Sequence, residues 1–163
     1  MRIASAADFY DGPIYTYYPL PDLIYDKRAR LFRFYPEPIL VVGCGFGGLV
    51  RAFRGLNKQA WGIDASQWAI ENRDKRVEKR VFNFDILDLS NWTLGQMETV
   101  ITEDLFPHLT DDEVLIAARH CQVLAPFVVN MVTEHGQDKG LNYRLTGYWM
   151  SLTGQPTISL EGM

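Results

Sequence analysis

The segment from residue 39 to residue 64 constrains the fold of this chain more than any other stretch. An uncharged, largely β-branched run at 39–42 (Ile-Leu-Val-Val) predicts a strand that is buried on both faces. A glycine-rich turn at 43–48 follows it directly, and apolar residues at helical spacing then predict a short helix over 49–56. The order strand, glycine turn, helix is typical of α/β proteins that bind a ligand at the turn.

A second short strand at 61–63 ends in the carboxylate Asp64. Glycines allow a tight turn and close approach of a ligand, and the helix behind them directs its free N–H groups toward it. A carboxylate at the end of the neighbouring strand accepts hydrogen bonds from ribose hydroxyls. The segment therefore predicts a site for a nucleoside-bearing cofactor. Gly43, Gly45 and Gly48, followed by Asp64, also fit the dinucleotide fingerprint, so the turn alone leaves a nicotinamide cofactor open.

Composition limits the classes of partner. With 163 residues, 47% of them apolar, the chain has enough material for one domain with a substantial core. A net charge of −4 makes nucleic acid an unexpected partner. The basic clusters at 27–30 and 73–80 have acidic neighbours, and we interpret them as solvated helix faces.

The sequence also bears on location and metal binding. No apolar run approaches the roughly 20 residues of a membrane span, and no signal-peptide pattern is visible, so we expect no membrane partner and a cytoplasmic protein. Cys44 and Cys121 are far apart, and neither is part of a CxxC pair. We expect reduced thiols and no metal site.

Strands and helices alternate along the rest of the chain. Ser66 is a good N-cap for a helix carrying Trp68–Ile70, with a charged continuation over 71–79, and Thr110 with Glu113 forms a capping-box pattern. The other expected elements are helices at 22–33, 110–124 and 142–152 and strands at 81–84, 99–102, 127–132 and 157–160. We predict a Rossmann-like α/β three-layer sandwich, with a mostly parallel sheet of about six strands that is shortened at its C-terminal end.

We predict a single domain over 1–163. Residues 1–37 form an aromatic lead-in, 38–133 the cofactor-binding core, and 134–163 a C-terminal helix and final strand. The tyrosine cluster at 15–18 has two interpretations: it covers one edge of the sheet, or it lies against the cofactor or substrate.

Functional-looking residues end four of the strands: Gly43, Asp64, Asp85 and Glu103. In an open parallel sheet, ligands bind at the carboxyl ends of the strands. Acids at several strand ends suit one long ligand, whereas a nicotinamide cofactor leaves Asp85 and the acids after the fourth strand without a role.

These segments resemble the class I S-adenosylmethionine-dependent methyltransferases. The turn at 42–47 is similar to the family's first motif, 62–66 with Trp68–Ile70 to its second-strand segment, 84–86 to its adenine-contacting segment, and 103–111 to the stretch after its fourth strand. The resemblance covers about residues 38–133.

The resemblance implies S-adenosylmethionine as cofactor, S-adenosylhomocysteine as product, and a role for each matching residue. Gly43, Cys44 and Gly45 would form the turn beside the methionine moiety, Cys44 by its place in the loop, with its side chain packing. Asp64 would hold the ribose, Ala65 and Ile86 would flank the adenine, Asp85 would take its amine, and Glu103 would face the methionine or the substrate. Candidate substrate contacts are Tyr18, Asp104, His108, His135 and Trp149. His120 is interpreted as an ordinary surface residue.

Two departures from the family stand out. Val41 occupies a position where the family often has an acid, so the methionine ammonium would be held by backbone carbonyls, Glu103 or an N-terminal residue. The family's sheet usually finishes with an antiparallel hairpin, and this sequence has one strand there. We therefore expect either an absent strand or a different pairing, with a homodimer as one way to cover the edge.

The sequence predicts transfer of a methyl group from S-adenosylmethionine to an unidentified acceptor; the acidic chain favours a small molecule and leaves a protein side chain as the alternative. No Asn/Asp-Pro-Pro-Tyr motif follows the fourth strand, and no catalytic base is identified. The alternatives are a non-catalytic protein that binds a nucleoside cofactor or a partner, and an NAD-dependent oxidoreductase.

Overall fold

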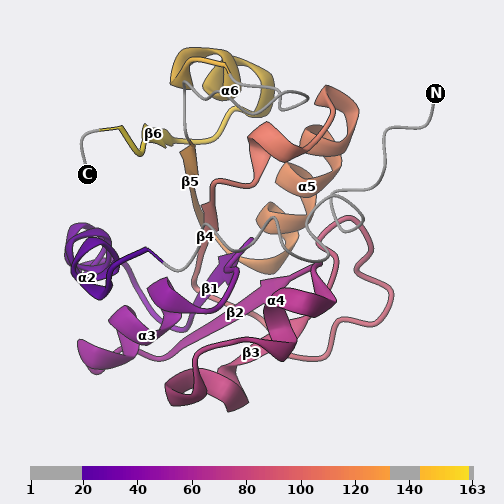
Figure 1. The fold of residues 1–163 in the computed structure, drawn as a ribbon. Helices are drawn as coiled ribbons and strands as arrows, with labels where there is room; N and C mark the ends of the chain where they lie inside the picture. Colours follow the sequence, from indigo (N-terminus) through magenta and orange to yellow (C-terminus); the bar gives the residue numbers. More distant parts are fainter. Residues whose placement is uncertain (1–19, 133–143, 162–163) are drawn as a thin grey trace.

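The apolar run at 39–42 forms β1 (Ile39–Val42), a central strand of the sheet. The structure, a computed structural model, describes residues 20–132 and 144–161 (Figure 1). The other strands are β2 (Ala60–Asp64), β3 (Val81–Asn83), β4 (Thr99–Glu103), β5 (Phe127–Val132) and β6 (Thr157–Ser159). The helices are α2 (Asp22–Leu31), α3 (Gly48–Gly55), α4 (Gln67–Glu71), α5 (Asp111–Leu124) and α6 (Thr146–Thr153), with 3₁₀ turns η2 (Lys75–Arg80) and η3 (Phe106–His108).

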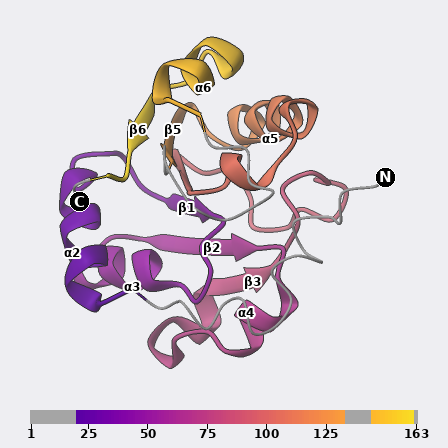
Figure 2. The same cartoon turned by 45° about the horizontal axis from the view of Figure 1, so that its top comes forward.

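In the part of the chain that the structure describes, six strands lie in the order β3-β2-β1-β4-β5-β6, and every neighbouring pair is parallel (Figure 2). The chain runs outward in one direction from β1 to β3 and in the other from β4 to β6. The strand order therefore reverses between β1 and β4, and α/β sheets bind ligands at the carboxyl ends of the strands at such a point. The predicted α/β class, with a mostly parallel sheet of about six strands, is confirmed.

Both faces of β1 are buried, which explains its unbroken apolar sequence. Ile39 and Val41 belong to the core beneath α2, α3 and η2. Leu40 and Val42 belong to the core beneath α5 and α6. Alternate residues of one strand thus fill two hydrophobic layers.

Helix α2, the first helix of the described residues, packs against the glycine turn. Tyr25 is buried, and a Cβ at Gly48 would lie 2.2 Å from its ring. The last glycine of the turn is therefore required for helix packing. At the surface, Arg51 of α3 bonds Asp26 at 2.8 Å, and Arg76 of η2 bonds Asp22 at 3.0 Å. The helix expected at 22–33 is present and joins the core, ending two residues early.

The expected charged continuation of the helix after Ser66 is wrong. Ser66 caps α4 as predicted, since its side chain accepts from the Ala69 amide at 3.1 Å, but the helix ends at Glu71. Asn72 closes it by donating to the Trp68 carbonyl at 2.9 Å. Asp74 then donates its amide to the Phe46 carbonyl and caps η2 with its side chain, which turns the chain onto a new axis.

The second half follows the predicted pattern more closely. Thr110 and Glu113 form the capping box of α5, and β5 has the expected bounds. Helix α6 begins at Thr146, whereas the helix was expected to begin at residue 142. Residues 142 and 143 lie outside the described residues. Within residues 20–132 and 144–161, no helix is both long and apolar enough to span a membrane.

A buried polar chain attaches β6 to the sheet. The Thr102 hydroxyl donates to Asn130 at 2.9 Å, the Asn130 amide donates to Gln155 at 3.0 Å, and the Gln155 amide donates to the Ala118 carbonyl at 2.8 Å. The Asn130 backbone amide also donates to the Pro156 carbonyl at 2.9 Å. Because buried polar groups need partners, this series of hydrogen bonds favours the observed parallel pairing of β6 with β5. The family resemblance leads one to expect an antiparallel hairpin at this place.

We predict that Gln155→Ala lowers the free energy of unfolding by about 1–3 kcal/mol, since it leaves buried hydrogen-bonding groups unpaired. The matched control is Gln122→Ala, at an exposed position of α5. Urea unfolding of both variants measures the difference. An equal effect of the two substitutions would contradict a role of this network in holding β6.

Candidate functional site

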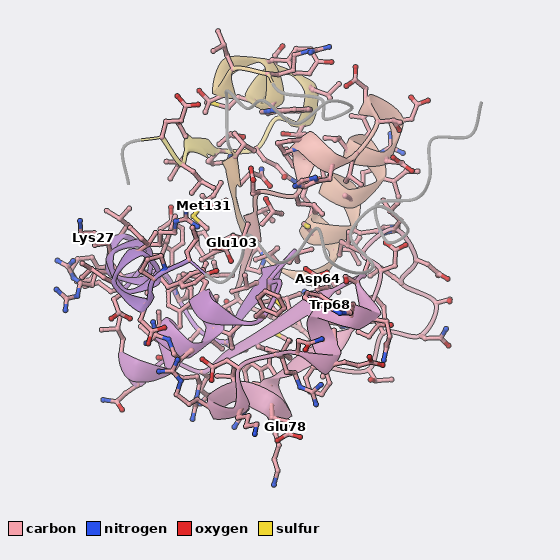
Figure 3. All side chains as sticks on the ribbon, in the orientation of Figure 1. Lys27, Asp64, Trp68, Glu78, Glu103 and Met131 are labelled. Carbon is pink, nitrogen blue, oxygen red and sulfur yellow. The ribbon has the colours of Figure 1, made fainter. Side chains whose placement is uncertain are left out.

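Three predicted site residues lie together at the carboxyl ends of neighbouring strands. Gly43 follows β1, while Asp64 and Glu103 are the last residues of β2 and β4. Figure 3 labels Glu103 near Met131 of β5, and Asp64 next to Trp68 of α4. The ends of β1, β2 and β4 thus bring Gly43, Asp64 and Glu103 to the same edge of the sheet.

Asp64 ties the end of β2 to the glycine turn. One carboxylate oxygen accepts from the Gly45 amide at 2.8 Å and the other from the Ser66 amide at 2.9 Å. The residue is 7% exposed. These two bonds fix the Asp64 carboxylate beside the glycine turn.

The turn must contain glycine where β1 meets β4. Gly43 has φ 74°, and a Cβ on it would lie 3.0 Å from the Glu103 carbonyl oxygen. A side chain here would be strained and would push the two strand ends apart. Gly43 therefore allows the ends of β1 and β4 to lie close together.

Cys44 contributes packing within this turn. Its side chain is buried, and its Sγ lies 2.7 Å from where a Cβ of Gly62 would be. Burial, followed by the nearby carboxylates Asp64 and Glu103, raises the pKa of the thiol well above its usual value. A buried, protonated thiol is a poor nucleophile. Its place in the turn is as expected, with its side chain in the core.

The last residue of β3 and the segment after β3, residues 84–90, begin beside the end of β2. The Asn83 side-chain amide donates to the carbonyls of Asp64 and Ala65 at 3.2 and 3.0 Å, and the Phe84 amide donates to the Asp64 carbonyl at 3.0 Å. Asp85 is exposed, whereas the side chain of Ile86 is buried in the α5-side core. These bonds hold the chain just before Asp85 against the end of β2.

Arg28 is the site residue that the sequence did not reveal. We interpreted residues 27–30 as a solvated helix face, and for Arg28 this is wrong. Its Nη1 donates to Glu103 Oε1 at 2.9 Å, and both side chains are 9% exposed. Its Nε is buried and has no partner among the described residues. Lys27, the preceding residue of α2, is exposed and points outward in Figure 3.

Near neutral pH, the charged and neutral forms of Glu103 are similar in free energy. Burial raises its pKa, Arg28 lowers it, and the carboxylates Asp104 and Asp64 raise it further, which gives a pKa of about 7. The cost of removing the carboxylate from water thus exceeds what one arginine returns. An additional positive group beside Glu103 would stabilise its charged form.

The predicted substrate contacts are distributed unevenly. Asp104 has φ 51° and donates its amide to the Met131 carbonyl at 2.8 Å, and His108 is half-buried at the end of η3. Trp149 is fully buried against Phe106 and Tyr148, and its Nε1 has no partner in 20–132 and 144–161. Tyr18 and His135 lie outside the described residues.

His120 is also more than an ordinary surface residue. Its Nδ1 lies 2.6 Å from the carbonyl oxygen of Ile86, which joins α5 to the segment after β3. The interpretation from sequence is therefore corrected. No local pattern signals this contact, because the partners are 34 residues apart.

Comparison with known proteins identifies the family. A family model described as a methyltransferase domain matches residues 40–127, more than half of the chain. The chain belongs to the methyltransferase domain family. The family predicted from the motifs is therefore confirmed. A search of curated proteins found no match.

Solved structures of methyltransferases share the fold. Magnesium protoporphyrin IX methyltransferase from Synechocystis PCC 6803, with bound SAM, has a TM-score of 0.71 at 13% identity, covering 94% of this chain and 86% of that one. The CcbJ methyltransferase from Streptomyces caelestis has a TM-score of 0.53 at 18% identity, covering 67% and 50%. A protein studied for the conversion of a disulfide bond into a thioacetal group during echinomycin biosynthesis has 0.53 at 23%, covering 61% and 44%. The chain spans about half the length of the last two.

We predict that Glu103 makes the folded methyltransferase domain less stable as pH rises. The folded pKa of about 7 lies above the ordinary value of 4.5, so the folded state keeps a proton that the unfolded chain has released. Relative to Glu103→Gln, which cannot ionise, the wild type should lose unfolding free energy between about pH 4.5 and about pH 7, with little change above about pH 8.

Urea unfolding at a series of pH values measures this difference. The exposed Glu98→Gln serves as control and should show no comparable trend. A difference between wild type and Glu103→Gln that stays constant over this range would contradict the account of Glu103.

Proposed function

We propose that this protein transfers a methyl group from S-adenosylmethionine to a small molecule. The observation that carries the proposal is the glycine turn after β1 in a methyltransferase domain: Asp64 accepts from its Gly45 amide, and Glu103, paired with the buried Arg28, ends the neighbouring strand β4. Class I methyltransferases are the family that the motifs resemble, and a relative of the same fold was solved with bound SAM.

The residues present suit the two ends of this cofactor. Asp64, whose carboxylate is bonded to the glycine turn, would accept the ribose hydroxyls, and Ala65, Asp85 and Ile86 would contact the adenine. The methionine end carries a carboxylate and an ammonium group. Arg28 has a buried Nε without a partner among the described residues, and Glu103 is a carboxylate short of positive charge. An α-amino acid supplies both missing charges, so Arg28 takes the carboxylate and Glu103 the ammonium.

This arrangement also answers the departure at Val41. The residue is fully buried in the core of β1 and presents no polar group. Glu103, on the adjacent strand, takes over the acid's role. Its partner arginine comes from α2, which lies outside the residues matched by the family model.

The cofactor supplies a methyl group that its sulfonium already activates, so the chain's own task is chiefly to position both reactants. Asp104 and His108 follow β4 beside the proposed methionine site and would face the acceptor. No catalytic base is assigned. A small acceptor is supported by the acidic net charge of the chain and by a relative whose name gives a porphyrin as substrate. A cytoplasmic location and a homodimer stay predictions from the sequence.

We predict that S-adenosylhomocysteine binds the wild type with micromolar affinity and that Asp64→Asn weakens it by about ten- to hundredfold, since charge-assisted hydrogen bonds to the ribose are lost. Calorimetric titration measures both, with NAD titrated in parallel and Asp112→Asn, an exposed acid of α5, as control.

The three readings of the sequence give different outcomes. Binding of NAD in place of S-adenosylhomocysteine would overturn the proposal in favour of the oxidoreductase. Binding of S-adenosylhomocysteine without methyl transfer to any of a panel of hydroxyl, amine, thiol and carboxylate small molecules would favour a non-catalytic cofactor-binding protein.

A further inference from the structure

The segment after β3 is held from two sides, and only one of them belongs to the proposed cofactor site. Toward β2, Asn83 and Phe84 bond the carbonyls of Asp64 and Ala65. Toward the other face of the sheet, the carbonyl of Ile86 meets Nδ1 of His120 on α5 at 2.6 Å. Asp85 lies between these two attachments.

The chemistry of the His120 contact has one direction. A carbonyl oxygen has no proton to give, so Nδ1 must carry the hydrogen and donate it. The contact joins elements that are distant in sequence, and the Ile86 side chain is 4% exposed in the core that α5 covers. Side chain and carbonyl of Ile86 are therefore both fixed against the α5 layer.

His120 faces the rest of this segment as well. The pKa of the exposed Asp88 is lowered chiefly by hydrogen bonds from Ser90, with a smaller electrostatic contribution from His120. Within the segment, Asp85 Oδ1 accepts from the Leu87 amide at 2.9 Å, and the Asp85 carbonyl accepts from the Asp88 amide at 3.1 Å. The direction of the Asp85 carboxylate thus depends on a short turn whose second attachment is His120.

We infer that His120 is a positioning residue for adenine recognition: by holding the Ile86 carbonyl, it directs the Asp85 carboxylate toward the exocyclic amine of the base. This inference rests on the proposed function, in which Asp85 takes that amine. The amine donates to a carboxylate, whereas the carbonyl oxygen that replaces it in hypoxanthine is an acceptor and is repelled. His120 therefore contributes to selectivity for adenine without touching the cofactor.

The test compares S-adenosylhomocysteine with S-inosylhomocysteine, in which a carbonyl oxygen replaces the amine and the adjacent N1 carries a hydrogen. We expect the wild type to prefer the adenine compound. His120→Leu, which keeps comparable bulk and removes the donor, should lose about tenfold of this preference, chiefly through weaker binding of the adenine compound. His120→Asn, whose amide nitrogen takes the place of Nδ1, should restore it. Arg119→Ala, at the exposed neighbouring position, is the control.

The outcomes separate the inference from the proposed function. A purely structural role of His120 would weaken both compounds equally, and an unchanged preference in His120→Leu would overturn the inference while leaving the cofactor assignment intact. Should His120→Leu fail to fold, the folded His120→Asn decides, because its loss of preference contradicts the inference. Failure of the wild type to bind either compound would instead contradict the proposed function.

Discussion

The ion pair between Arg28 and Glu103 connects the N-terminal helix to the point where the strand order of the sheet reverses. Arg28 Nη1 lies 2.9 Å from Glu103 Oε1, and both side chains are almost fully buried. Removing two charges from water costs more than the pair returns, as the pKa of Glu103 near 7 indicates. Such a pair is a weak source of stability, which makes a role in binding the better explanation of its position.

Other contacts place α2 so that Arg28 can reach this position. Tyr25 lies against Gly48, where any side chain would collide with its ring. Ion pairs of Arg51 and Arg76 hold the exposed side of the helix. The glycine turn therefore has two functions: Gly43 keeps β1 close to β4, and Gly48 admits the helix that supplies the arginine. A lead-in segment outside the matched family region becomes part of the site.

The elements that the sequence predicted well have local signals. The apolar run of β1, the glycine turn, Asp64 at a strand end and the capping box at Thr110 can each be recognised within a few residues. Arg28 and His120 could not be recognised in this way, because their partners are 75 and 34 residues away. In addition, the local sequence does not show whether a polar residue of a helix is exposed or buried. The break after Glu71 escaped notice because it depends on the bond from Asp74 to Phe46.

The C-terminal side of the sheet shows the same limit. A strand at 157–160 was predicted, but its parallel pairing with β5 is favoured by Asn130 and Gln155, two polar residues inside an apolar layer. Fold class follows from the alternation of strands and helices, whereas strand direction depends on such individual buried contacts.

The central claim is that Arg28 and Glu103 bind the amino-acid end of the cofactor. The most direct measurement compares the affinities of S-adenosylhomocysteine and 5′-methylthioadenosine, which lacks that end, for wild type, Arg28→Met and the control Lys27→Met. The account predicts that Arg28→Met weakens the first compound by about ten- to hundredfold and the second by less than about twofold, with Lys27→Met like wild type. The double variant Arg28→Met/Glu103→Gln removes the unpaired buried charge and should behave in the same way. Full retention of the preference for S-adenosylhomocysteine in the Arg28 variants would contradict the account.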